Sequence, residues 1–67
     1  MELSINGEQK DIEMNQPTVA SLIRELALSS SRVAVELNGT LVRNSMRDDT
    51  TLQEGDRVEI VTLVGGG

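Results

Sequence analysis

The last sixteen residues of the chain, 52–67, read LQEGDRVEIVTLVGGG. Gly55, between two acidic residues, predicts a turn. Residues 57–64 then form the most apolar segment of the sequence, and they are rich in the β-branched side chains that strands favour. Three glycines follow without a spacer. The segment therefore predicts a buried strand that leads directly into a glycine tail.

Alternation of side chains divides this predicted strand into two faces. The members of the first face are Val58, Ile60, Thr62 and Val64. The members of the second face change from charged to apolar as the strand approaches the tail: Arg57, Glu59, Val61 and Leu63. We expect a partner to dock on this second face.

Two Asn-Gly dipeptides, at 6–7 and 38–39, lie between stretches of alternating apolar residues, which is typical of hairpins with type I′ turns. The first turn pairs Ile5 with Glu8. Strand parity then places several apolar residues on one face: Met1, Leu3, Ile5, Ile12 and Met14. The second dipeptide joins a predicted strand at 33–37 to one that begins at 40–42.

Apolar residues between the hairpins recur at helical spacing, at Val19, Leu22, Ile23 and Leu26. This stripe predicts an amphipathic helix over residues 18–28. Thr18 is expected to be its N-cap, because a threonine hydroxyl can accept a hydrogen bond from an amide of the first turn. The serines at 29–31 predict a loop back to the sheet. Residues 43–51 predict a polar, irregular connection, and Leu52 is expected to close one end of the core.

Five strands and one helix can bury the helical stripe if the helix packs across one face of the sheet, an arrangement of the α+β class. The ubiquitin-like β-grasp has this order of elements. Its mixed sheet makes the first and last strands parallel neighbours, which accounts for the apolar character of residues 57–64. We therefore expect one β-grasp domain over residues 1–64 and a flexible tail over 65–67.

Composition excludes several classes of function. The 67 residues contain no Cys and no His, so disulfides, the commonest metal ligand and the usual neutral-pH base are missing, and no metal site is expected. The chain also has no aromatic residue and a net charge of -5, which argues against binding to nucleic acid. It has no signal-peptide pattern and no apolar run of membrane-spanning length, so we expect a cytoplasmic protein with no membrane partner.

The reactive group that remains is the carboxylate of Gly67. Gly65, Gly66 and Gly67 extend over at most about 10 Å and fit a narrow enzyme channel where a Cβ would clash. An α-carboxyl has an ordinary pKa of about 3.3–3.7, so it is an anion at neutral pH that can attack the α-phosphorus of ATP. A sulfide or persulfide could convert the acyl adenylate to a thiocarboxylate. Glycine ends are usually disordered, and the position directly after the last strand is what favours a function here.

Residues 52–61, the Val64-Gly65-Gly66-Gly67 end and the Asn38-Gly39 dipeptide resemble the ThiS family, the sulfur carriers of thiamine biosynthesis. The resemblance covers nearly the whole chain and is most specific in its last sixteen residues. It implies that a ThiF-like adenylyltransferase, similar to ubiquitin-activating enzymes, uses ATP to adenylate Gly67. Sulfur derived from cysteine, through a cysteine desulfurase or another donor, would then form the thiocarboxylate.

The same resemblance implies that a ThiG-like thiazole synthase accepts the sulfur and that the carrier holds no permanent cofactor. It also implies partner contacts through Val61, Leu63 and Val64.

Several alternatives stay open at this point. The small subunit of molybdopterin synthase shares the tail but tends to be longer and proline-rich before it, whereas Pro17 is the sole proline here. Carriers for tRNA thiolation or amino-acid synthesis share the signature. A ubiquitin-like modifier that forms an isopeptide bond through Gly67, or an interaction domain with an inert tail, belongs to a different class. An enzyme is least favoured, because the acidic pairs at 48–49 and 54/56 lie in predicted loops where solvated or capping roles are commoner.

Overall fold

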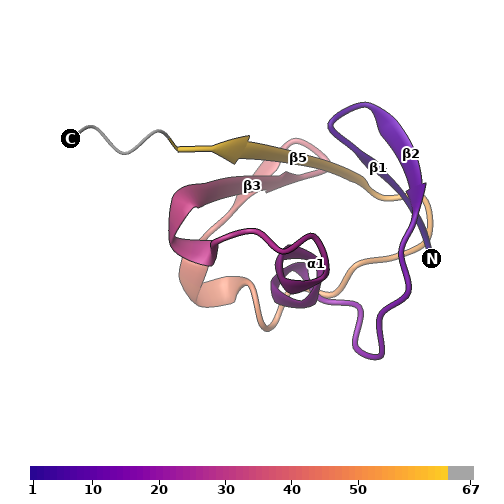
Figure 1. The fold of residues 1–67 in the computed structure, drawn as a ribbon, viewed down its shortest axis with the longest axis horizontal. Helices are drawn as coiled ribbons and strands as arrows, with labels where there is room; N and C mark the ends of the chain where they lie inside the picture. The colour runs from indigo at the N-terminus through magenta and orange to yellow at the C-terminus, as the bar shows by residue number, and fades with distance from the viewer. Residues whose placement is uncertain (64–67) are drawn as a thin grey trace.

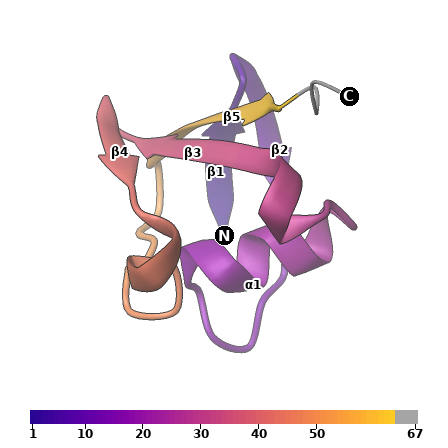
Figure 2. The ribbon, with the colours of Figure 1, turned by 90° about the vertical axis from the view of Figure 1, so that its left-hand side faces the viewer.

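The computed structural model describes residues 1–63, which form a mixed five-stranded sheet with one α-helix across one face (Figures 1 and 2). The strands are β1 (Glu2–Ile5), β2 (Glu8–Asp11), β3 (Val33–Leu37), β4 (Thr40–Val42) and β5 (Arg57–Thr62). The helix α1 spans Val19–Glu25, and the 3₁₀ turns η1 and η2 span Ser30–Arg32 and Asn44–Met46. The strand order is β2-β1-β5-β3-β4. The predicted α+β class and the ubiquitin-like β-grasp are confirmed.

The predicted pairing of the first and last strands is confirmed as well. Strand β5 lies at the centre of the sheet, parallel to β1 and antiparallel to β3. Parallel neighbours cannot be joined by a tight hairpin, so the chain between β1 and β5 contains the rest of the domain.

Both Asn-Gly turns have the predicted geometry. Asn6 and Gly7 have φ values of 51° and 82°, and Asn38 and Gly39 have 51° and 88°. Positive φ at both central residues defines a type I′ turn, whose twist matches that of the flanking strands. Ile5 pairs with Glu8 as expected. These two local turns fix the register of both hairpins.

The core fills the space between the sheet and the helix. Its buried members come from every layer: Leu3, Ile5, Val19, Leu22, Ile23, Val33, Val35, Val42, Leu52, Val58 and Ile60. Leu52 is only 1% exposed, so its predicted role at the end of the core is confirmed. Burying one such aliphatic side chain stabilises the fold by about 1.5–3 kcal/mol.

The helix begins as expected and ends early. The Ser21 amide donates to the Thr18 hydroxyl at 3.1 Å, which confirms the N-cap. The prediction that the helix continues to residue 28 is wrong, because Ala27 adopts φ = 57°. Its amide donates to Arg24 O, and the Leu28 amide donates to Ile23 O. This bonding pattern is a Schellman C-cap, which is usually built on glycine.

Residues 43–51 lack regular strands or α-helix, as expected, but they contain a buried charged residue that the sequence did not indicate. Arg47 is 5% exposed. Its guanidinium donates to Ser30 O at 2.7 Å and to Val33 O at 2.6 Å. The serine run 29–31, predicted as a loop, leads into the η1 turn that receives the first of these bonds. Arg47 thus ties this connection to the start of β3.

We predict that Arg47→Met lowers the free energy of unfolding by about 2–4 kcal/mol, because methionine leaves two part-buried or buried carbonyls without their charged donor. Chemical denaturation measures the change. Arg43→Met is the matched control, since Arg43 is exposed, and it should change stability by about 0.5 kcal/mol or less. Equal effects of the two substitutions would contradict the assigned role of Arg47.

Candidate functional site

Strand β5 carries the chain from the centre of the sheet to the predicted tail. Thr62, the last strand residue, pairs with Val33 of β3. The Leu63 amide donates to Arg32 O at 2.6 Å, so the sheet still holds the chain one residue later. The far end of β5 and the N-terminus lie at opposite ends of the molecule (Figure 1).

The predicted tail site falls outside the described residues. Val64, one of the three docking candidates, and the glycines at 65, 66 and 67 belong to this part. Their roles stay predictions, and so does the division of the chain at residue 64. The predicted strand over 57–64 is confirmed for Arg57–Thr62.

Two asparagine side chains, neither foreseen from the sequence, hold β5 from both sides. The Asn6 amide group donates to Ile60 O at 3.0 Å and accepts from the Ile60 amide at 2.7 Å. It thus bonds both polar groups of one residue, as a neighbouring strand would. On the other side, Asn38 Oδ1 accepts from the Arg57 amide at 2.9 Å. Each turn residue therefore extends the contact between its hairpin and β5.

The two predicted faces of β5 are confirmed for residues 57–61, whereas Thr62, assigned to the same face as Val58 and Ile60, is exposed. Val58 and Ile60 are buried against the core, whereas Arg57, Glu59 and Val61 are exposed on the face that the helix leaves uncovered. Val61 is 59% exposed and Leu63 is 49% exposed. These two docking candidates are accessible in the free protein.

The acidic residues before β5 have structural partners. Asp56 accepts from the Gln53 amide at 2.8 Å and from the Asn38 side chain at 3.1 Å. Glu54 accepts from the Glu2 amide at 2.9 Å. Of the solvated and capping roles expected for the Glu54/Asp56 pair, the structure thus shows hydrogen bonds to backbone and side-chain donors. No cluster of three potential metal-ligating side chains occurs in residues 1–63.

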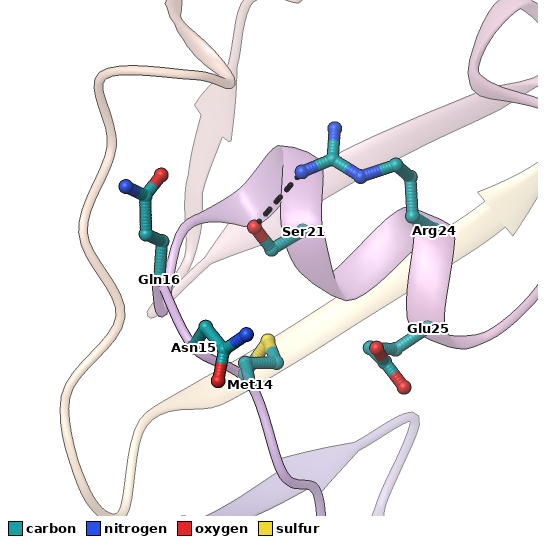
Figure 3. A pocket seen from close by; sticks show the side chains of 6 residues that line it. All are labelled: Met14, Asn15, Gln16, Ser21, Arg24 and Glu25. Atoms are coloured by element: carbon teal, nitrogen blue, oxygen red, sulfur yellow. Dashed lines mark hydrogen bonds between the residues drawn. The ribbon is translucent and has the colours of Figure 1, made fainter.

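A shallow hollow of about 360 Å³ lies beside α1, away from the β5 face. Its lining comes from α1 and the segment before it: Met14, Asn15, Gln16, Ser21, Arg24 and Glu25 (Figure 3). The Ser21 hydroxyl already accepts hydrogen bonds from Arg24 and Thr18, both at 3.1 Å. These bonds belong to the helix cap, and the hollow supplies no activated nucleophile.

At the N-terminus, the Asp11 carboxylate accepts a hydrogen bond from the Met1 amino group at 3.1 Å. That bond raises the pKa of the amino group. The pair closes the open end of the first hairpin and is remote from the end of β5.

Among the helices that the structure describes, none has the length and apolarity needed to cross a membrane.

Comparison with known proteins gives concordant matches. A model of the ThiS family matches residues 2–67. A thiazole synthase of Paramagnetospirillum magneticum is 40% identical over the whole chain, which spans 20% of that relative's length. An uncharacterised protein, ycf40, of Porphyra purpurea is 36% identical over 97% of the chain and 90% of its own.

A solved structure agrees with these sequence matches. The crystal structure of a thiamine biosynthesis protein (ThiS) from Geobacter metallireducens superimposes with a TM-score of 0.85 and 33% identity, covering all of both chains.

We predict that Asn6→Gly, which keeps the positive φ accessible, lowers the free energy of local opening at Ile60 by about 1–2 kcal/mol because both side-chain bonds are lost. Amide hydrogen exchange measures this as faster exchange of Ile60. In Asn6→Asp the carboxylate can still accept from that amide, so Ile60 should stay better protected than in the glycine variant. Unchanged exchange in Asn6→Gly would contradict the role given to Asn6.

Proposed function

The chain belongs to the ThiS family, and from that premise we propose that it is a sulfur carrier in the biosynthesis of the thiazole moiety of thiamine. The observation that carries the proposal is the course of β5. This strand lies at the centre of the sheet, and the sequence continues from it into Gly65-Gly66-Gly67. We propose that Gly67 presents a carboxylate that partner enzymes modify and that the chain itself is not the catalyst.

The proposed chemistry has two steps, both catalysed by other proteins. A carboxylate oxygen of Gly67 attacks the α-phosphorus of ATP, which releases pyrophosphate and forms an acyl adenylate. A hydrosulfide equivalent then attacks the acyl carbon, displaces AMP and leaves a thiocarboxylate. The absence of Cys and His from the sequence supports this route, because neither of the usual side-chain nucleophiles or bases for acyl transfer competes with the terminus.

The proposal names three partners. An E1-like adenylyltransferase of the ThiF type would consume ATP, a cysteine desulfurase or another donor would supply sulfur, and a ThiG-like thiazole synthase would accept it. The relative named thiazole synthase supports the last partner, because its match to the whole chain occupies only a fifth of that longer protein. Since ATP and cysteine are cytoplasmic metabolites, the proposal places the carrier in the cytoplasm.

Docking of the adenylyltransferase is proposed through Val61 on the exposed face of β5, through Leu63 directly after the strand, and through Val64. The exposure of Val61 and Leu63 supports this assignment. Transfer of sulfur to thiazole synthase, rather than to the large subunit of molybdopterin synthase, distinguishes the thiamine pathway from its nearest alternative.

We predict that removing Gly66 and Gly67 abolishes ATP-dependent adenylation and leaves the melting temperature within about 2 °C of that of the intact chain. The physical reason is that the core and the sheet are formed within residues 1–63. Pyrophosphate release with the cognate adenylyltransferase and thermal unfolding measure the two properties.

The matched control is Gly65→Ala in the intact chain, which keeps the terminal Gly-Gly pair and the same length. It should retain more adenylation than the truncated chain. A truncated chain that is adenylated as fast as the intact one would refute the proposed function.

A further inference from the structure

Two glutamates lie directly opposite each other on the exposed face of the two central strands. Glu36 of β3 pairs with Glu59 of β5, and both residues are exposed. The Cβ atoms of directly opposed residues lie about 4.5–5.5 Å apart, and like charges at that separation destabilise a sheet. The Glu36–Glu59 pair therefore weakens the pairing of β3 with β5, which the rest of the fold stabilises.

Within the described part of the chain, no salt bridge engages these two carboxylates. Residues 1–63 contain two ion pairs, Met1 with Asp11 and Lys10 with Glu8, and both lie on the first hairpin. Neither Glu36 nor Glu59 accepts a side-chain hydrogen bond there. Arg57 shares their face, yet it forms no ion pair with either. The like-charged pair is left to solvent or to a partner.

Exposed aliphatic side chains flank the two carboxylates. Leu41 of β4 lies opposite Glu36 and is 61% exposed, and Val61 follows on the same face of β5 with 59% exposed. Figure 2 shows β4, β3 and β5 side by side, with α1 on the other side of the sheet. We call Leu41, Glu36, Glu59 and Val61 the acidic patch.

The geometry points to the acidic patch as the docking site for a basic side chain of the adenylyltransferase. This Arg or Lys would sit between Glu36 and Glu59, and aliphatic side chains of the adenylyltransferase next to it would cover Leu41 and Val61. This inference rests on the proposed function for the identity of the partner. Charge complementarity selects the occupant, because a cation would relieve the repulsion and form charge-assisted hydrogen bonds with both carboxylates. A second copy of the chain would instead bring four carboxylates together.

The position of the patch couples docking to the tail. Glu59 lies three residues before the end of β5, and a strand rises about 3.3 Å per residue. A partner that holds Glu59 and Val61 therefore holds the strand about 10 Å or less from its last residue. The net charge of -5 adds long-range attraction to a basic surface.

The test is a pair of double variants that remove the same two negative charges. Glu36→Gln/Glu59→Gln removes them from the acidic patch, and Glu13→Gln/Glu25→Gln removes them from exposed positions before and on α1. Binding to the cognate adenylyltransferase is measured by calorimetry without ATP, so that it reports docking alone, at low and at high ionic strength.

We expect the patch variant to bind about tenfold more weakly at low salt, with the difference shrinking at high salt, and to be at least as stable as the parent. The control should stay within about threefold of the parent. Equal weakening of binding in both variants would show that the net charge of the chain, and not the position of the glutamates, determines the affinity. That result would overturn the inference. So would parent-like binding of the patch variant, or a clear loss of its stability.

Adenylation of the unsubstituted chain with ATP is measured separately and keeps the two proposals distinguishable. If the unsubstituted chain is adenylated but the patch variant binds as the parent does, the inference alone fails. If the patch variant shows the weakened binding while no adenylation occurs, the inference stands and the proposed function fails. Absence of any binding by the unsubstituted chain would overturn the inference.

Discussion

The central position of β5 is the constraint on which the rest of the structure depends. Its backbone is bonded to β1 on one side and to β3 on the other, and the side chains of Asn6 and Asn38 extend those contacts. Because β1 and β5 run parallel, no tight hairpin can join them, and the helix and the other three strands lie between them in the sequence. The last strand thus joins the β1–β2 hairpin to the β3–β4 hairpin, and its two faces have different surroundings.

One face of β5 supplies the core and the other supplies a surface. Val58 and Ile60 are buried with the helix residues, whereas Glu59 and Val61 face outward beside β3. Burial on the first face stabilises the strand enough to tolerate an unpaired glutamate on the second. A small domain has little stability to spare, so a repulsive pair at the centre of its open face is better explained by a partner than by the fold.

The sequence was sufficient to predict the features that depend on local rules. Asn-Gly specifies type I′ turns through its tolerance of positive φ, and the alternation in residues 57–61 separates the core face from the open face. It could not reveal the side-chain bonds of Asn6, whose partner Ile60 is 54 residues away. The early helix end at Ala27 and the burial of Arg47 were also missed, because alanine rarely occupies a Schellman cap and arginine is rarely buried. The opposition of Glu36 and Glu59 required the register of two distant strands.

The proposed carrier function places the reactive group at the end of the chain rather than in any hollow of the domain. Fragment-ion mass spectrometry of the protein after co-expression with its adenylyltransferase and sulfur donor tests this most directly. We predict that one oxygen is replaced by sulfur in the C-terminal fragment that contains Gly67 and in no other fragment. An unmodified C-terminal fragment, or one joined to a lysine of another protein, would contradict the sulfur-carrier function.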